Sequence, residues 1–356
     1  MRTSRRVSVG EVPLGGDAPV VVQSMTNTPT SDPGATLAQI ERLAAFGAEI
    51  VRVAVPDVES TEALPSILAS SPVPLVADVH FDADLALRSL RAGVHKLRLN
   101  PGNIARAEDV RRIAAEASDR EVPIRVGVNS GSVPGKLRKR YGGVNERSMW
   151  EAARSHVSLL EELGFEDIVV SLKASDPRLT VRANLLAAEN CDYPLHLGVT
   201  EAGPGLTGAV RSTVAITELL LHGIGDTVRI SLTGPPEDEP VVAWEILSSL
   251  GLRKGFPRIV SCPTCARARL DVAAMAGEVA AHLRGRKADI TVAVMGCEVN
   301  GPGEAREADL AVIGAPSGCL LFREGRMLRR IDPGNVLPEL DREIDRIAQR
   351  NQGGAK

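Results

Sequence analysis

A repeating unit of strand, loop and helix constrains the fold of this chain more than any other feature. In each unit a short apolar segment is followed by a polar loop and an amphipathic segment, which often closes on glycine. Strands that alternate with helices in this way form a parallel sheet with right-handed crossovers. The expected strands are Val20–Met25, Ile50–Val55, Leu75–Phe81, Lys96–Asn100, Ile124–Asn129, Ile168–Ala174, Leu195–Thr200 and Thr227–Leu232.

Eight such units over residues 1–252 predict a (β/α)8 barrel, the TIM barrel. An open doubly wound sheet is the alternative, but no GxGxxG motif follows the first strand. Glycine stands just past four of the expected helices, where a left-handed residue is wanted. These positions are Gly47, Gly93, Gly164 and Gly223.

The pattern changes after a linker that begins at Arg253. Residues 253–356 are expected to form a small α+β domain with a helix over Arg267–Leu283, a hairpin around Glu324 and Gly325, and a C-terminal helix. Its other expected strands are Arg258–Ser261, Ile290–Met295 and Ala308–Gly314.

Composition narrows the function classes. A net charge of −3 argues against general nucleic-acid binding. No apolar run approaches the roughly 18 residues that span a bilayer, and no apolar segment follows the basic N-terminus, so no secretory signal is expected. We therefore expect a cytoplasmic protein that binds neither nucleic acid nor membrane.

Cations stand where a barrel interior is normally aliphatic. Side chains alternate between the two faces of a strand, and this parity places five cations on the inner face near the carboxyl ends of the strands. They are Arg52, Arg98, Arg125, Lys173 and Arg229. Burying unpaired cations costs several kcal/mol each, and Asp78 with Glu201 cannot neutralise five. An anionic ligand with two phosphates is the simplest partner, although some of these cations could instead form internal ion pairs or point outward at the rim.

Two further features near the expected site have more than one interpretation. His80 shares a face with Asp78, which makes it a candidate for hydrogen bonding or proton transfer. The long segment Ser130–Arg147, which carries several basic residues, is expected to be a loop. It could be a lid over the site or a solvated basic surface.

The second domain carries a metal-binding pattern. Cys262 and Cys265 form a CxxC motif, and Cys297 follows a later strand. From spacing alone, zinc and an iron–sulfur cluster are nearly level, although no suitably placed histidine completes a zinc site. Cys191 and Cys319 lack this context and are expected to be packing residues.

Several strings in this sequence resemble those of the 4-hydroxy-3-methylbut-2-enyl diphosphate synthase family, in its two-domain bacterial form. The similarity covers nearly the whole chain and includes both cysteine motifs. The matching strings are Val21–Thr28, Leu75–Phe81, Leu97–Asn103, Ile124–Asn129 and His196–Gly203.

The resemblance implies a reaction: reductive ring opening of 2-C-methyl-D-erythritol 2,4-cyclodiphosphate in non-mevalonate isoprenoid biosynthesis. Two single electrons would arrive from flavodoxin or ferredoxin through one [4Fe–4S] cluster per subunit. A homodimer is also implied, with the cluster domain of one subunit capping the barrel of the other.

The resemblance assigns roles to residues as well. Cys262, Cys265 and Cys297 would ligate the cluster, with Glu304 as an exchangeable fourth ligand. Asp78, His80 and Glu201 would contact the carbon skeleton, with Glu201 a candidate proton donor. The substrate-binding set would be Arg52, Arg98, Asn100, Arg125, Asn129, Lys173, Arg229, Ser231 and Asn300.

Two other functions remain open at the level of sequence. The barrel could be a phosphate-binding lyase or transferase with a structural zinc domain. Alternatively, the cluster could act as a redox sensor without turnover.

Overall fold

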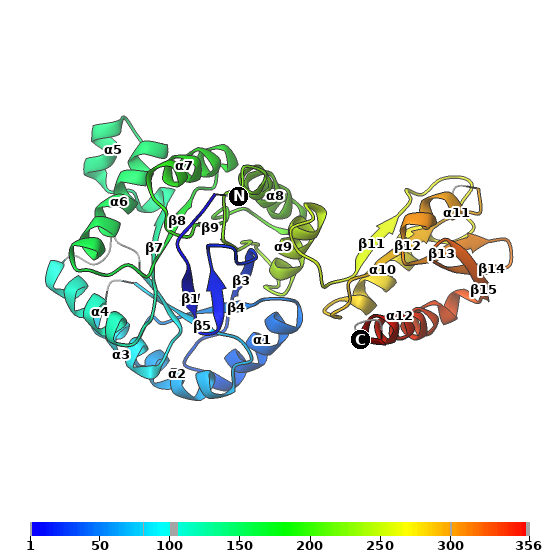
Figure 1. Ribbon diagram of the computed structural model, residues 1–356, viewed down its shortest axis with the longest axis horizontal. Helices are drawn as coiled ribbons and strands as arrows, with labels where there is room; N and C mark the ends of the chain where they lie inside the picture. Colours follow the sequence, from blue (N-terminus) through cyan, green and yellow to red (C-terminus); the bar gives the residue numbers. More distant parts are fainter. Residues whose placement is uncertain (1, 81, 100–105, 300, 354–356) are drawn as a thin grey trace. The chain divides into compact units, whose positions relative to one another are not determined.

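The computed structural model describes residues 2–80, 82–99, 106–299 and 301–353. The chain divides into two compact units, Met1–Arg253 and Lys254–Lys356. Figure 1 shows the first unit as a ring of helices around a central sheet and the second as a smaller sheet with helices.

The sheet of the first unit has eight strands and is parallel throughout. Its strands are β3 (Val21–Met25), β4 (Ile50–Ala54), β5 (Leu75–Val79), β6 (Lys96–Leu99), β7 (Ile124–Asn129), β8 (Ile168–Lys173), β9 (His196–Leu197) and β10 (Thr227–Val228). They lie in the order β8-β7-β6-β5-β4-β3-β10-β9. A parallel bridge between Val170 and Leu195 joins the two ends of this order and brings the sheet close to full closure. The predicted TIM barrel is confirmed.

The helices of the first unit follow the strands in turn. They are α1 (Pro33–Ala45), α2 (Val58–Ser70), α3 (Ala83–Ala92), α4 (Ala107–Asp119), α5 (Gly135–Tyr141), α6 (Glu146–Glu162), α7 (Pro177–Asn190), α8 (Gly205–Leu221) and α9 (Asp238–Ser249). Several start at an aspartate whose carboxylate accepts backbone N–H groups, for example Asp32 and Asp57. The four glycines predicted to end helices all have positive φ, between 70° and 100°.

Two sequence-based expectations about this unit were wrong in detail. Strands β9 and β10 are two residues long rather than six. The segment expected as a long loop, Ser130–Arg147, is mostly helical: it holds a 3-10 turn at Ser130–Ser132, helix α5 and the start of α6. Gly142 in a left-handed conformation ends α5, and Asn145 caps the long helix α6, so local signals in this segment favour helix over loop.

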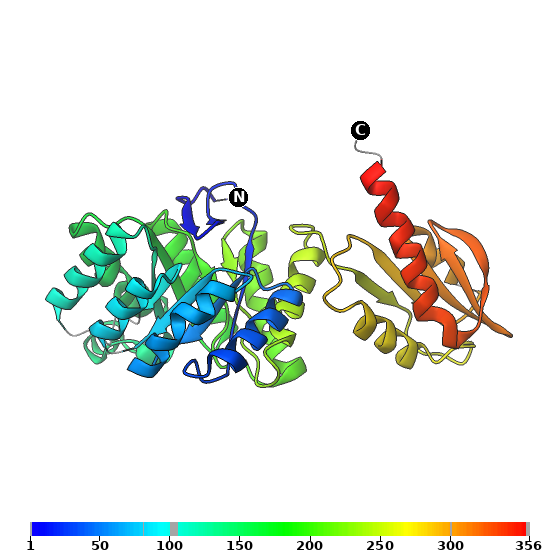
Figure 2. The ribbon, with the colours of Figure 1, turned by 90° about the horizontal axis from the view of Figure 1, so that it is seen from below.

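An N-terminal hairpin closes the amino end of the barrel. It consists of β1 (Val7–Val9) and β2 (Val12–Leu14), which pair antiparallel. Its apolar side chains form one buried cluster with residues at the amino ends of barrel strands. Figure 2 shows the hairpin lying across one end of the barrel. The clustered barrel residues are Val21, Ile50, Val76 and Val169.

The second unit is built on a five-stranded sheet in the order β11-β12-β13-β14-β15. Its strands are β11 (Arg258–Ser261), β12 (Thr291–Met295), β13 (Leu310–Ala315), β14 (Gly318–Arg323) and β15 (Arg326–Ile331). Helices α10 (Val272–Leu283) and α12 (Val336–Gly353) pack on one face of the sheet, and the short α11 (Gly301–Glu304) leads to a 3-10 turn against the other. The first two strand pairings are parallel and the last two antiparallel.

No helix among the described residues is both long and apolar enough to cross a membrane.

Candidate active site

A polar cavity of about 150 Å³ lies at the carboxyl ends of the barrel strands. The carboxyl end is where TIM-barrel enzymes place their active sites. All five cations that strand parity assigned to the inner face line this cavity. The full lining is Arg52, Asp78, His80, Arg98, Arg125, Gly127, Asn129, Ser171, Lys173, Thr200, Arg229 and Ser231.

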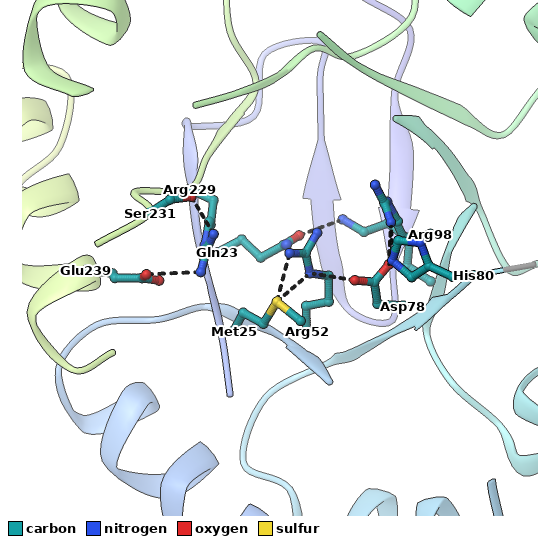
Figure 3. Close-up of polar contacts among 10 residues, drawn as sticks. Gln23, Met25, Arg52, Asp78, His80, Arg98, Arg229, Ser231 and Glu239 are labelled. Atoms are coloured by element: carbon teal, nitrogen blue, oxygen red, sulfur yellow. Dashed lines mark hydrogen bonds and ion pairs between the residues drawn. The ribbon is translucent and has the colours of Figure 1, made fainter. Parts of the chain in front are cut away.

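Asp78, at the end of β5, is the counter-charge for two of these arginines. Its Oδ1 accepts a hydrogen bond from Nη1 of Arg98 at 2.8 Å, and its Oδ2 lies 3.6 Å from Nε of Arg52. Arg52 also contacts the thioether of Met25 (Figure 3). Burial alone would raise the pKa of Asp78, but the neighbouring cations and His80 outweigh it and hold this pKa well below its usual range. The carboxylate therefore stays charged at any physiological pH.

His80 lies on the same cluster and is more exposed. Its Nε2 is 2.7 Å from Nη1 of Arg98 and 3.4 Å from Oδ1 of Asp78 (Figure 3). Nε2 is thus within reach of a donor, Arg98, and of an acceptor, Asp78, and its role depends on which ring nitrogen carries the proton. The ring therefore contacts both members of the Arg98–Asp78 ion pair at the cavity.

Arg229 has a counter-charge that sequence reasoning missed. Its Nη2 lies 3.0 Å from Oε1 of Glu239, a buried residue in the first turn of α9, and its Nη1 contacts Ser231. Glu239 also accepts from the hydroxyl of Ser24 at 3.1 Å and from the backbone N–H of Leu232. Burial raises the pKa of Glu239, and Arg229 opposes that rise. The ion pair with Glu239 therefore holds the guanidinium of Arg229 in place.

Arg125 and Lys173 lack such counter-charges. Arg125 is 2% exposed, and its Nε and Nη1 have no hydrogen-bond partner among the described residues. Lys173 is 7% exposed and forms no ion pair with any residue that the structure describes. Burial lowers the pKa of Lys173, and the charge of Arg125 lowers it further. Five cations therefore line the cavity with one carboxylate, Asp78, while Glu239 pairs with Arg229 outside the lining, and the unpaired donors require an anion.

Two glycines create room for the long cations. A Cβ on Gly198 would lie 2.8 Å from Nζ of Lys173 and 2.4 Å from the carbonyl oxygen of Arg229. A Cβ on Gly127 would lie 3.3 Å from Nε of Arg98. Both glycines are therefore explained by the close approach of a side chain.

The remaining predicted site residues fall into three groups. Asn129 and Ser231 line the cavity. Glu201 is exposed, has a positive φ of 53° and is not among the lining residues, although its neighbour Thr200 is. Asn100 and Asn300 lie outside the described residues.

The three predicted cluster cysteines lie at one edge of the second unit. Cys262 directly follows β11 and Cys297 follows β12, and these strands are parallel neighbours paired through Ser261 and Val294. The backbone N–H of Gly296 donates to Sγ of Cys262 at 3.2 Å. Such N–H donors to sulfur are typical of thiolate ligands of iron–sulfur clusters.

The proposed ligand side chains that the structure describes do not all lie at metal-binding distances from one another. Among the described residues no group of three or more His, Cys, Asp or Glu side chains lies close enough to hold a metal ion. The chemistry of the donors nevertheless fits a thiolate-bound cluster, since Cys262 and Cys297 are half-buried thiols and Cys265 is an exposed one at the same strand edge. Glu304 is exposed at the end of α11.

The other two cysteines have different surroundings. Cys319 is buried in the core beneath α10 and α12, and burial raises the pKa of its thiol. Cys191 follows α7 and contacts Arg2, and burial raises its pKa also. Both environments are those of packing residues.

Fold and site together define the class: a TIM-barrel enzyme with a strongly cationic cavity at the carboxyl ends of its strands and a separate thiol-bearing unit. Comparison with known proteins then identifies the family. A family model described as the GcpE TIM-barrel domain matches residues 4–244, and one described as the GcpE protein C-terminal domain matches residues 258–346. The chain belongs to the GcpE family.

Curated relatives agree along almost their whole length. A protein of Geobacter sulfurreducens is 51% identical over 97% of this chain and 98% of its own, and one of Maridesulfovibrio salexigens is 49% identical over 99% of each. A third, from Geobacillus thermodenitrificans, is 47% identical over 97% of this chain and 92% of its own. All three are named 4-hydroxy-3-methylbut-2-en-1-yl diphosphate synthase (flavodoxin).

Two solved structures resemble this chain over part of its length. The 7,8-dihydropteroate synthase of Vibrio fischeri matches with a TM-score of 0.51 at 11% identity, over 70% of this chain and 99% of its own. An N-acetylneuraminic acid synthetase of Leptospira borgpetersenii also reaches 0.51 at 11% identity, over 70% of this chain and 91% of its own. At this identity the likeness concerns the fold only.

Proposed function

We propose that this protein is a 4-hydroxy-3-methylbut-2-en-1-yl diphosphate synthase. It converts 2-C-methyl-D-erythritol 2,4-cyclodiphosphate to 4-hydroxy-3-methylbut-2-enyl diphosphate in non-mevalonate isoprenoid biosynthesis. The conversion takes up two electrons and two protons, opens the ring and releases water. The observation that carries the proposal is the near full-length identity of about half to relatives of that name.

The cavity supports this substrate independently of the comparisons. Five cations and one carboxylate, Asp78, line it, and Nε and Nη1 of Arg125 have no partner among the described residues. A cyclic diphosphate supplies two negative charges and several acceptor oxygens in a compact ligand, which suits guanidinium forks. A phosphate-binding lyase or transferase with a structural zinc domain is not favoured, because relatives that match along nearly the whole chain carry the synthase name.

In this mechanism the barrel binds and orients the substrate. Arg125 and Lys173 hold phosphate oxygens, while Arg52, Arg98 and Arg229 do so from positions fixed by Asp78 and Glu239. The substrate-binding set includes Asn129 and Ser231, and we propose Asn100 and Asn300 as further members. We propose that His80, which lines the cavity, contacts a substrate hydroxyl and that Glu201 donates a proton.

The second unit would hold the cofactor. We propose that Cys262, Cys265 and Cys297 ligate one [4Fe–4S] cluster per subunit, with Glu304 as the fourth and exchangeable ligand. When bound, the cluster supplies the single electrons that the reduction needs. The N–H of Gly296 that now donates to Cys262 would stabilise the thiolate charge.

Partners follow from the same proposal. The names of the relatives support flavodoxin as electron donor, and ferredoxin is the other donor that we propose. By family resemblance the enzyme works in the cytoplasm as a homodimer, in which the cluster unit of one subunit covers the barrel of the other. Light scattering on the purified protein measures the oligomeric state directly.

An anaerobic product assay tests the function. Protein reconstituted with iron and sulfide is given the cyclodiphosphate with dithionite and a viologen dye, and the diphosphate product is quantified. Turnover supports the proposal, and it is contradicted if a preparation with about four iron atoms per chain forms no product. A preparation that binds zinc and no iron would instead support the structural-zinc alternative.

A further inference from the structure

A second polar tier lies inside the barrel, below the cavity. Each of its members stands two residues before a residue that lines the cavity or adjoins a lining cation, and therefore points to the same face, one layer nearer the amino end of its strand. Barrel layers at this depth are normally aliphatic. The four members are Gln23, Lys96, His196 and Thr227, which precede Met25, Arg98, Gly198 and Arg229. All four are 0–1% exposed.

This tier is short of hydrogen-bond partners. Nζ of Lys96 donates to Oε1 of Gln23 at 3.1 Å. The Nε2 of Gln23, both ring nitrogens of His196 and the hydroxyl of Thr227 have no partner among the described residues. Within the described part of the chain, Lys96 forms no ion pair with a carboxylate.

The charges that face Lys96 are all positive. Arg125 on β7 and Arg52 on β4 lower its pKa in addition to the larger effect of burial, while Gln23 on β3 contributes only an amide. His196 on β9 is itself held neutral, because burial and the charges of Lys173, Arg125 and Lys96 lower its pKa well below the usual value. Neither Asp78 nor Glu239 forms an ion pair with Lys96, so nothing within the tier compensates its charge.

The balance of charges inside the barrel indicates which basic side chains lose their proton. Six basic side chains, the five of the cavity and Lys96, face Asp78 and Glu239, and these two carboxylates contact only Arg52, Arg98 and Arg229. Arg125, Lys173 and Lys96 are left without counter-charge. An arginine does not lose its proton in a protein, whereas a buried lysine readily does.

We propose that Lys96 is a positioning residue that is neutral in the ligand-free barrel and takes up a proton from solvent when a phosphorylated ligand binds above it. The ligand's negative charge offsets Arg125, so the ammonium form of Lys96 becomes tolerable. Repulsion from the new ammonium charge then favours a position of Arg125 closer to the ligand. The inference rests on the proposed anionic ligand. Ligand binding would then be coupled to the uptake of a proton.

Calorimetry under turnover-free conditions tests this coupling. The cyclodiphosphate, whose two phosphates are already ionised at neutral pH, is titrated without reductant into the protein in buffers of different ionisation enthalpy. The dependence of the binding heat on the buffer gives the number of protons taken up. We expect at least about one proton for the wild type, and a decrease of about one in Lys96→Met. Lys254→Met, which removes an exposed lysine of the other unit, should leave the number unchanged.

The pH dependence provides a readout that a packing role would not change. Wild-type Kd should rise by up to about tenfold per pH unit for each coupled proton, and Lys96→Met should flatten that slope. Lys96→Arg retains a charge that cannot be released, so it should restore binding relative to Lys96→Met without restoring the slope. If Lys96→Met fails to fold, a wild-type Kd that is constant from pH 7 to pH 9 is enough to overturn the proposal.

A second probe separates this inference from the proposed function. Sulfate is a tetrahedral dianion that does not titrate in this range. Sulfate binding with proton uptake, in a protein that does not bind the cyclodiphosphate, supports the role of Lys96 and contradicts the proposed substrate. Cyclodiphosphate binding without proton uptake supports the substrate and contradicts the role of Lys96.

Discussion

Nη1 of Arg98 donates to Oδ1 of Asp78 across a distance of 2.8 Å, and both side chains are at most 7% exposed. The two residues face each other from adjacent strands, β5 and β6, where Asp78 and Arg98 are partners in the register. The same carboxylate reaches Arg52 on β4. One carboxylate therefore orients two of the five cavity cations, and its removal should displace both arginines.

Replacing Asp78 by Asn should be costly for stability and activity. Removing one partner of a buried ion pair typically costs about 3–5 kcal/mol of unfolding free energy. We also expect turnover to fall about a hundredfold as the arginines lose their positions. Because the pKa of Asp78 is depressed in the folded state, its stabilising effect is present above the unfolded pKa and is lost as pH falls toward the folded one.

Chemical denaturation of Asp78→Asn at pH 7, beside an activity assay, measures both effects. Asp84→Asn is the matched control, because Asp84 is an exposed carboxylate that pairs with Arg112 at 3.3 Å on the outside of the barrel. Equal stability and turnover in the two variants would show that Asp78 does not organise the cavity.

Replacing Gly198 by Ala should displace Lys173. The new methyl group would lie 2.8 Å from Nζ of Lys173 and 2.4 Å from a backbone oxygen, so the strand or the lysine must shift. We expect an increase in KM of about tenfold or more, together with reduced stability, measured by steady-state kinetics and thermal unfolding. Gly34→Ala in α1, whose Cβ meets its nearest neighbour at 3.6 Å, should retain wild-type kinetics.

The cysteines should divide into two classes by iron content. Serine at Cys262, Cys265 or Cys297 should abolish cluster absorbance and acid-labile sulfide, because each removes a proposed thiolate ligand. Alanine at Cys191 or Cys319 should leave iron content unchanged, with a stability cost at the buried Cys319. Full iron content in a serine variant of the first class would remove that cysteine from the ligand set.

The barrel should lose stability in mild acid because of His156 on α6. Burial lowers the pKa of this histidine to about 4, whereas its value in the unfolded chain is about 6.5. As pH falls from 6.5 toward 4, the unfolded state binds a proton that the folded state does not, so folding becomes less favourable. We expect a loss of about 1–2 kcal/mol between pH 7 and pH 5.

Fluorescence-detected denaturation follows this loss in the barrel unit, because both tryptophans of the chain, Trp150 and Trp244, belong to it. His156→Gln should lose less stability over the same pH range. An identical pH profile for the variant would show that other groups cause the acid sensitivity.

The barrel and the composition of its cavity were accessible from sequence because both depend on short-range patterns. Strand positions alone fix parity, and parity alone brought Arg52, Arg98, Arg125, Lys173 and Arg229 to one face. The second counter-charge was missed because Glu239 lies in a helix, ten residues beyond Arg229, where strand parity says nothing. Glu201, which the resemblance gave as a candidate proton donor, is exposed and is not among the lining residues.

The alternation of side chains along a strand also could not predict how deep a residue such as Lys96 lies inside the barrel. Lys96 was assigned to the same face as Arg98, but its burial and its amide partner Gln23 depend on how neighbouring strands are staggered. The short pairing of β9 and β10 was also beyond the pattern, because it depends on how these strands meet β3 and β8. A Cβ on Gly198 would lie 2.4 Å from the backbone oxygen of Arg229 and 2.8 Å from Nζ of Lys173, and both of these residues belong to neighbouring strand segments.

The N-terminal hairpin has a kinetic consequence. Val7, Val9 and Leu14 pack against the amino ends of the barrel strands. The barrel interior is therefore closed at that end and opens only at the carboxyl end. Substrate and product must then share one route, so each blocks the other's passage. Anything that covers that mouth during reduction also governs how quickly the next molecule can enter.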